Sequence, residues 1–400
     1  MQIQRGFLVA LVGALALTCL PARAGTPAWV STIPIETGAQ ERVETSPDGA
    51  AWAVIDHSRV LRSTDSGLTW LPVNPVPVSG LGLPASGPDL GGSSDTSVAP
   101  VSALEALGGN AHAFSRTLDG GSTWRHVDVP SVTTPAGYDG TDLLRRTGSR
   151  YWLAPGGFDV VNGCATPLRS TPLLSSRDGS RWTRTDLPLR SGLVRDLRFR
   201  DARVGAVSVY DYRITQVNDS NGCGYQGEAS TTVVFVTQDA GRTWRRSTTC
   251  PRTCTLAWTR SGVLTLGEWD GVIRDSRDVG RTFRHTASLP TLPQVLGLQS
   301  LDCWGERCWA LVNGGGIWRR DGGGEWIEEA SDADAPGICV AGIAAIDGTH
   351  AVAAGPHALM SRTETGTSSP SAPTYAVVRP VRLGPGLVRD GATVRLDVRL

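Results

Sequence analysis

Polar side chains that could recognise a ligand gather in two long insertions, residues 158–169 and 212–230. These segments and their borders supply carboxylates, an amide, guanidinium groups and phenols: Asp159, Asn162, Arg169, Asp211, Tyr212, Arg213, Asp219, Tyr225 and Glu228. This mixture can hydrogen-bond to, and stack on, a polar protein surface or a sugar. Long loops on a rigid scaffold commonly carry function, so we predict a ligand site here. The alternative is a pair of ordinary solvated loops.

Catalytic and metal chemistry has weaker support in the residue pattern. Glu268, Asp270 and Glu306 are expected near strand ends, but no spacing pairs them as an acid and a base. Cys250 and Cys254 have no companion pair, and the six His show no metal-ligand spacing. We therefore assign no catalytic residue, no metal ligand and no cofactor, and the sequence leaves enzymatic activity undecided.

A short phrase built on Asp and Gly recurs six times and defines the elements that must carry these insertions. It reads S-T-D-S-G-L-T-W at residues 63–70 and returns at intervals of ~40–60 residues, as modular folds do. Each copy suits a tight turn between antiparallel strands, because Asp accepts hydrogen bonds from its own turn and Gly adopts positive φ. The paired Asp and closing aromatic residues are Asp65 and Trp70, Asp119 and Trp124, Asp178 and Trp182, Asp239 and Trp244, Asp278 and Phe283, and Asp321 and Trp326.

The repeated phrase resembles the Asp box, also called the BNR repeat, of sialidases, sortilin-type receptors and photosystem assembly-factor-like propellers. In those proteins the box is the turn between the third and fourth strands of a propeller blade, away from the ligand site. The resemblance implies an all-β propeller of four-stranded blades with structural box aspartates. The alternating apolar and polar residues and short Gly-rich turns agree with an all-β chain. Because propeller loops alternate between two faces, we expect both insertions on the face opposite the boxes.

Seven blades are expected from a worn seventh copy at residues 361–366, which has Thr363 in place of Asp and no Trp after it. Residues 29–34 have the shape of the outer strands that follow the boxes, such as residues 124–130. We therefore predict that this N-terminal segment supplies the outer strand of blade seven and closes the ring, which removes exposed sheet edges. Residues 75–98 are too rich in Pro, Gly and Ser for us to place the inner strand of blade two.

Sialidases are the enzymes that the resemblance suggests, and they use several arginines, a Tyr with a Glu partner, and an Asp. Their Arg-Ile-Pro phrase has only Thr32-Ile33-Pro34 as a counterpart here, and no Tyr has a matching motif. We favour a non-catalytic module that binds a protein or a glycan; the alternative is a sialidase-like glycoside hydrolase with a diverged site. An arginine cluster at the central mouth of the loop-bearing face would favour the hydrolase. A small or apolar lining would favour binding.

Residues 1–24 resemble a secretory signal, with Arg5, an apolar run over residues 6–20 and a small-residue cleavage site at residues 22–24. Export favours disulfides. Cys303 and Cys308 flank a short turn and can form a bridge across a hairpin, and Cys164 and Cys223 lie in the two insertions, so we predict both bridges. Three cysteines remain ambiguous, with a bridge between the first two as the simplest pairing: Cys250, Cys254 and Cys339.

Composition limits the class of partner. The formal net charge is zero, with 38 basic and 38 acidic residues, so nothing indicates nucleic acid or an anionic membrane. Every basic residue is Arg, which is typical of a GC-rich bacterial genome. We expect an exported, monomeric protein with a propeller over residues 25–366, a Ser- and Pro-rich linker over 367–374 and a short β-like tail over 375–400.

Overall fold

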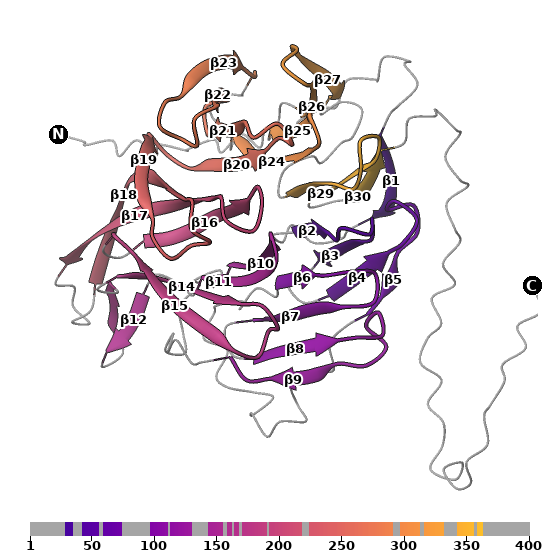
Figure 1. The fold of residues 1–400 in the computed structure, drawn as a ribbon, viewed down its shortest axis with the longest axis horizontal. Coiled ribbons are helices and arrows are strands. Elements are labelled where there is room, and N and C mark those ends of the chain that lie inside the picture. The colour runs from indigo at the N-terminus through magenta and orange to yellow at the C-terminus, as the bar shows by residue number, and fades with distance from the viewer. Residues whose placement is uncertain are drawn as a thin grey trace, which may run out of the picture. The chain divides into compact units, whose positions relative to one another are not determined.

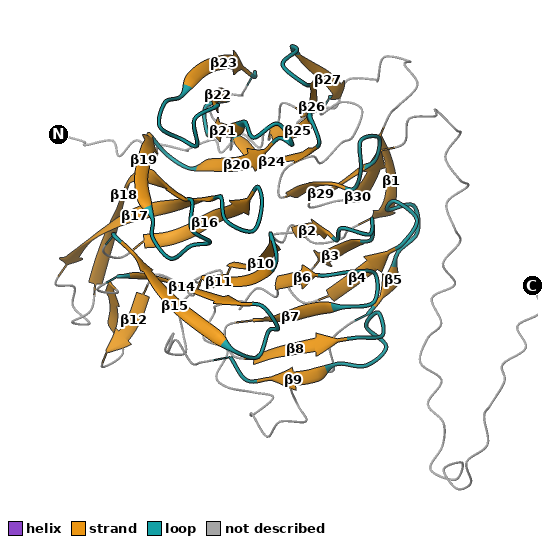
Figure 2. Cartoon of the chain, in the orientation of Figure 1, coloured by secondary structure: helices purple, strands orange, loops and turns teal. Residues whose placement is uncertain are grey.

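A computed structural model of the chain describes residues 29–34, 42–55, 59–73, 97–110, 113–129, 143–154, 158–161, 164–167, 170–189, 192–217, 224–290, 297–312, 316–331, 342–355 and 358–362. These residues form seven four-stranded antiparallel blades in a ring, and none of them is helical (Figures 1 and 2). The prediction of an all-β, seven-bladed propeller is therefore confirmed. None of the described residues belongs to a helix that could span a membrane.

Blades 1 to 3 follow the chain from its N-terminal part, and a small extra hairpin is inserted into blade 3. The strands are β2 (Arg42–Thr45), β3 (Ala51–Ile55), β4 (Arg59–Ser63) and β5 (Leu71–Pro72); β6 (Ser97–Pro100), β7 (Ala106–Asn110), β8 (Ala113–Thr117) and β9 (Arg125–Val127); and β10 (Leu143–Thr147), β11 (Arg150–Ala154), β14 (Thr171–Ser176) and β15 (Trp182–Leu187), with β12 (Phe158–Val161) and β13 (Cys164–Pro167) as the hairpin. The inner strand of blade 2, which the sequence did not place, is β6.

Blades 4 to 7 complete the ring. Their strands are β16 (Gly192–Phe199), β17 (Gly205–Val217), β18 (Gly224–Thr237) and β19 (Arg245–Cys250); β20 (Cys254–Trp258), β21 (Leu264–Glu268), β22 (Val272–Ser276) and β23 (Arg284–Ser288); β24 (Leu298–Trp304), β25 (Arg307–Val312), β26 (Gly316–Asp321) and β27 (Trp326–Ala330); and β28 (Gly342–Ala345), β29 (Ala351–Gly355), β30 (Ala358–Arg362) and β1 (Trp29–Pro34). The first strands of neighbouring blades contact one another around the centre of the ring.

The N-terminal segment closes the ring as predicted. Strand β1 pairs antiparallel with β30, with Trp29 opposite Arg362 and Pro34 opposite Ala358. Blade 7 thus combines one strand from the beginning of the chain with three from residues 342–362. Closure of this kind removes the sheet edge that an incomplete last blade would expose.

The six Asp-containing turns, which we call the Asp turns, each join the third strand of a blade to its fourth, in blades 1 to 6. In blades 1 to 5 a Ser or Thr hydroxyl two residues before the Asp donates to its carboxylate at 2.8–3.1 Å. That hydroxyl also accepts the N–H of the turn glycine at 2.8–3.0 Å. The Asp therefore organises its own turn, in keeping with a structural role.

Blade 6 departs from this pattern because Arg319 stands where the other turns have Ser or Thr. Its Asp321 carboxylate instead accepts from Arg307 at 2.5 Å and from Arg319. Burial would raise the pKa of Asp321, but the hydrogen bonds from these two guanidinium groups lower it below its ordinary value. The turn is therefore held by long side chains rather than by its own hydroxyl.

The closing aromatic residue of a turn packs into the interface with the preceding blade. Trp70 of blade 1 is 4% exposed, packs among Val352 and Leu359 of blade 7, and donates its indole N–H to Thr32 Oγ1 at 3.2 Å. Trp244 of blade 4 lies 6.3 Å, centroid to centroid, from Trp152 of blade 3 in an edge-on arrangement. We call these closing aromatic residues wedge residues, because each buries a large apolar surface between two blades.

Two disulfides lie within the described residues. The predicted bridge between Cys303 and Cys308 is confirmed and spans a hairpin, with the Cα atoms 4.0 Å apart. Cys250 and Cys254 are also joined, with a Cα separation of 6.3 Å, so the bridge ties the last strand of blade 4 to the first strand of blade 5. Cys223 and Cys339 lie outside the described residues, so the bridge from Cys164 to Cys223 stays a prediction.

The chain divides into two units, Met1–Gly366 and Thr367–Leu400. The second unit, the signal-like segment at residues 1–24 and the worn turn copy at residues 363–366 all lie outside the described residues. The boundaries predicted for the signal, linker and tail therefore stay predictions.

Replacing a wedge tryptophan should destabilise the ring strongly. We expect Trp70→Ala and Trp244→Ala to lower the free energy of unfolding by about 3–5 kcal/mol each, because each leaves a cavity between two blades. The matched control is Trp304→Ala, since Trp304 is 41% exposed, and it should cost below ~1 kcal/mol. Chemical denaturation followed by fluorescence measures all three. Equal costs for wedge and control would contradict the packing role.

The Asp turns should also set the acid limit of stability. Hydrogen bonds from the Thr123 hydroxyl and backbone N–H lower the pKa of Asp119 from 3.8 to about 2. A lowered carboxylate pKa stabilises the fold above the unfolded value and loses that contribution as the pH falls through the folded value. We expect the unfolding free energy to decline between pH ~4 and ~2. Thr123→Val should move the decline to higher pH, and an unchanged acid profile would contradict this.

Candidate functional site

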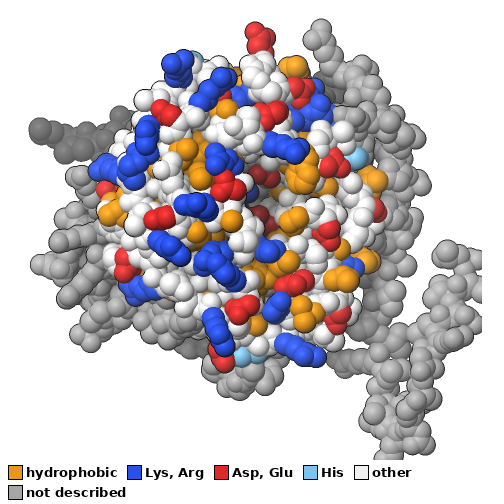
Figure 3. Space-filling model, viewed as in Figure 1, with side chains coloured by type: hydrophobic (Ala, Val, Ile, Leu, Met, Phe, Trp, Pro, Cys, Tyr) orange, Lys and Arg blue, Asp and Glu red, His pale blue; other side chains and the backbone are white. Residues whose placement is uncertain are grey.

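The ring has two chemically different faces. The Asp turns and the turns between first and second strands share one face, which we call the Asp-turn face. The connections between second and third strands and between blades share the other, which we call the loop face. Positively and negatively charged side chains are interspersed over the face that Figure 3 shows.

Both predicted insertions lie on the loop face, because each joins the second and third strands of its blade. The first forms the β12–β13 hairpin between β11 and β14. The second extends β17 and β18 to 13 and 14 residues, whereas the corresponding strands β21 and β22 of blade 5 have five each. The insertions are therefore paired strands rather than irregular loops.

The predicted ligand residues are only partly placed by these hairpins. Asp159 lies on β12, Asp211, Tyr212 and Arg213 lie on β17, and Tyr225 and Glu228 lie on β18. Arg213 is paired with Glu228 across the hairpin backbone. Asp211 is half-buried, and the side chains of the other five residues lie outside the described part of the chain. Asn162, Arg169 and Asp219 lie outside the described residues altogether.

A cavity of about 230 Å³ lies at the central mouth of the loop face. Its walls are the beginnings of the seven inner strands β2, β6, β10, β16, β20, β24 and β28, together with Thr253 and Trp269. Four arginines contribute to the lining: Arg42, Arg145, Arg195 and Arg198. No sequence pattern pointed to these residues individually, because they come from three different blades.

Two of these arginines are held in a chain of ion pairs across the centre of the ring. Arg145 of blade 3 contacts Glu44 of blade 1 at 2.7 Å and also pairs with Asp196 of blade 4. Arg198 lies 3.3 Å from Asp196 and 3.4 Å from Asp302 of blade 6. Negative and positive side chains therefore alternate along this series of ion pairs, from Glu44 to Asp302.

Backbone groups complete this network. The two carboxylate oxygens of Asp196 accept the N–H groups of Leu197 and Leu256 at 2.9 and 2.8 Å, and Asp302 accepts the N–H of Ala345 at 2.9 Å. The network thus joins inner strands from six blades. Arg42 of blade 1 donates to Ser97 of blade 2 at 2.6 Å, which connects blade 2, the only blade outside this network.

The carboxylates of the network keep the Arg198 guanidinium charged. Burial alone would lower the pKa of the Arg198 guanidinium, but the carboxylates of Asp302 and Asp196 raise it above its ordinary value. Buried ion pairs persist where additional hydrogen bonds satisfy the charged groups, as backbone N–H groups do here for Asp196 and Asp302. The remaining arginine, Arg195, is exposed and lies over the Tyr210 ring at 5.9 Å.

Of the three carboxylates considered as catalytic candidates, Glu268 and Asp270 lie near each other in blade 5, whereas Glu306 lies on the opposite face. Glu268 is buried beside Arg274 at 2.8 Å, and burial raises its pKa. Asp270 follows in the next turn of blade 5, whereas Glu306 lies on the Asp-turn face of blade 6. None of the three lines the central cavity. The three carboxylates therefore do not form a catalytic site at the central mouth.

Breaking the central network should be costly. Asp196→Asn leaves two guanidinium groups without their shared carboxylate, so we expect the unfolding free energy to fall by about 3 kcal/mol or more. The control is Asp186→Asn, because the pair of Asp186 with Arg184 is roughly half exposed, and its loss should cost below ~1 kcal/mol. Thermal and chemical unfolding would distinguish the two variants. If Asp196→Asn lowered the unfolding free energy no more than Asp186→Asn does, the network would add no stability.

Comparisons with known proteins define the fold and leave the family open. No protein-family model and no curated protein matches the chain. A solved structure described as YCF48 bound to D1 peptide is similar over 86% of this chain and 99% of its own, at 17% identity and a TM-score of 0.56. YCF48 from Cyanidioschyzon merolae covers 84% of this chain and 98% of its own, at 14% identity and a TM-score of 0.51.

A further similar structure is PorZ, described as a surface component of the type-IX secretion system of Porphyromonas gingivalis. The match spans 83% of this chain and 37% of the PorZ chain, at 14% identity and a TM-score of 0.50. Identities this low establish the propeller fold and carry no assignment of function.

Proposed function

We propose that this chain is an exported, non-catalytic propeller that binds a segment of a protein partner at the central mouth of the loop face. The observation that carries the proposal is the cavity of about 230 Å³ enclosed by all seven inner strands. It is smaller than the ~300–1,000 Å³ of typical small-molecule pockets. It suits one anchoring side chain or a chain end, and the hairpins of blades 3 and 4 offer further contact surface on the same face.

The charges of the cavity support recognition rather than chemistry. The carboxylates Glu44 and Asp196 are both engaged by Arg145, so neither is poised as a general base. Arg195 at the exposed rim can instead meet an acidic or carbonyl-rich partner, since guanidinium groups donate several hydrogen bonds in a fixed geometry. The peptide in the YCF48 structure gives a precedent on the same fold.

The remaining sequence predictions belong to this proposal. We infer that the Asp turns are Asp boxes of the BNR type, that residues 1–24 direct export and that residues 367–374 link the propeller to a short tail. The two disulfides agree with an oxidising compartment. We expect the protein to act as a monomer, in a GC-rich bacterium.

A peptide-display selection on the immobilised full chain tests the function. We expect enriched peptides whose affinity falls about tenfold or more in Arg195→Glu, because reversing a rim charge places like charges against the partner. The control is Arg181→Glu, which makes the same change at an exposed position in an Asp turn. Anisotropy titrations give the affinities. No enrichment, or equal loss in both variants, would contradict the proposed site.

The second candidate is the sialidase-like hydrolase, and the four arginines at the mouth are the observation in its favour. Two of them are neutralised by carboxylates, and no Tyr is among the described residues that line the cavity. A fluorogenic panel of sialosides and β-glucans decides the matter. Turnover that survives repurification and disappears in Asp196→Asn, with the fold retained, would replace the binding proposal.

A further inference from the structure

A second cavity, also of about 230 Å³, lies on the Asp-turn face between blades 5 and 6. Blade 5 contributes its first turn and the residues Asp275 and Arg277, and blade 6 contributes Glu306, Arg320 and the glycines of its Asp turn. This cavity is at the opposite end of the blades from the central mouth.

The cavity exists because one interface between blades is left unfilled. In other blades the turn glycine is packed against the preceding blade, so that a Cβ on Gly67 would meet Val352, one on Gly241 would meet Trp152, and one on Gly280 would meet Val236. The corresponding Gly323 of blade 6 has nothing within 4 Å of a Cβ, nor has Gly322 beside it. The backbone of this turn also differs, because Gly67, Gly241 and Gly280 are buried with positive φ whereas Gly323 is exposed without it. The space beside Gly323 is therefore open.

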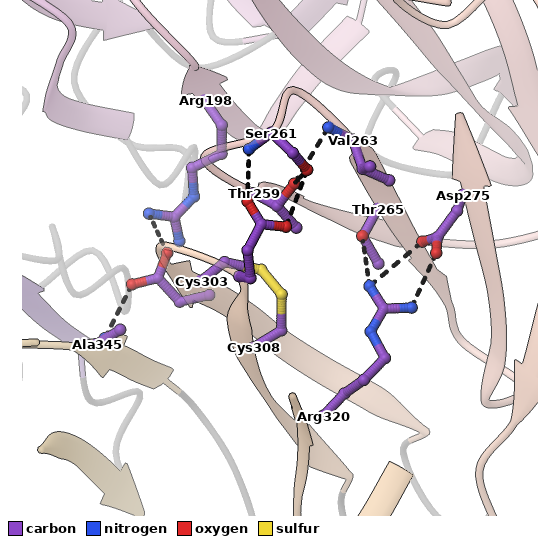
Figure 4. The surroundings of a disulfide bond; sticks show 12 residues. Arg198, Thr259, Ser261, Val263, Thr265, Asp275, Cys303, Cys308, Arg320 and Ala345 are labelled. Atoms are coloured by element: carbon purple, nitrogen blue, oxygen red, sulfur yellow. Dashed lines mark hydrogen bonds and ion pairs between the residues drawn. A yellow bond between two sulfur atoms is a disulfide. The ribbon is translucent and has the colours of Figure 1, made fainter. Parts of the chain in front are cut away.

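The walls around this opening are polar and firmly positioned (Figure 4). The buried Arg320 guanidinium donates to Asp275 at 2.8 Å and to Thr265 at 3.0 Å. Glu306 is exposed, and its two carboxylate oxygens accept the backbone N–H and the hydroxyl of Ser261 at 2.6 and 2.8 Å.

The disulfide between Cys303 and Cys308 anchors the turn that carries Glu306. The carbonyl of Gly305 in that turn also accepts the backbone N–H of Arg260 of blade 5 at 2.7 Å. Glu306 is therefore fixed relative to both walls of the cavity before any ligand arrives, which lowers the entropic cost of binding.

We propose that this cavity is a second binding site, for a single neutral, hydroxyl-rich sugar residue such as the end of a glycan. Two acidic and two basic side chains line it, so neither an anion nor a cation is favoured by net charge. Carboxylates accept, guanidinium groups donate, and the Ser261 hydroxyl, which donates to Glu306, can still accept, so the walls match sugar hydroxyls that both donate and accept. The missing side chain at Gly323 lets a ring approach the backbone closely.

Saturation-transfer NMR on the full chain tests this with four neutral sugars: glucose, galactose, mannose and N-acetylglucosamine. We expect transfer to at least one of them. Gly323→Leu should abolish it by filling the open space, since Gly323 does not need a positive φ. Glu306→Gln should weaken binding about tenfold through loss of a charge-assisted hydrogen bond. The control is Ser122→Leu, which adds the same side chain to an exposed position in the Asp turn of blade 2.

Unfolding curves of each variant separate loss of binding from loss of fold. Transfer that persists in folded Gly323→Leu would overturn the site. No transfer to any of the four sugars would overturn the ligand class. The ligand class would also be overturned if Gly323→Leu abolished the binding of a peptide but left the binding of the sugars unchanged. The peptide selection at the loop face uses different variants, so either proposal can fail without the other.

Discussion

Packing of the Asp turns of blades 1 to 5 against the preceding blade is the constraint on which the propeller depends. A blade by itself is a small twisted sheet whose two faces are apolar, and it becomes stable only when both faces are covered. The turn supplies this cover with a buried glycine and, in blades 1 and 4, a buried tryptophan such as Trp70 or Trp244. The carboxylate inside the turn holds both in place, so an exposed polar interaction controls a buried apolar one.

The same packing requirement extends to the first blade, whose Asp turn must pack against blade 7. Trp70 of blade 1 can pack only when blade 7 is complete, and blade 7 is complete only when β1 has joined β30. Formation of the last interface therefore requires contacts between residues about as far apart as the chain allows. The polar network at the centre, from Glu44 to Asp302, adds a second set of connections between blades.

The two candidate sites arise at places where these rules are relaxed. The central mouth is polar because the inner strands converge and place arginines of several blades together, which their carboxylate partners then neutralise. The cavity between blades 5 and 6 arises where Arg319 replaces the hydroxyl of the turn and the following glycines lose their packing partner. Function in a repeat protein is often found where one repeat differs from the others, because the regular interfaces are already filled.

The sequence by itself determined the fold class, the number of blades, the closing strand and the disulfide between Cys303 and Cys308. These follow from local signals, since an Asp turn, an alternating strand or a pair of cysteines beside a turn is written in consecutive residues. The loop face was also predictable from the position of the insertions. What the tertiary structure alone decided is which side chains meet. Arg145, Asp196 and Arg198 contact partners in other blades, and no local pattern specifies a contact between residues more than fifty positions apart. The open space at Gly323 likewise depends on what the neighbouring blade fails to supply, because packing between blades is set by shape across an interface rather than by the order of residues along the chain.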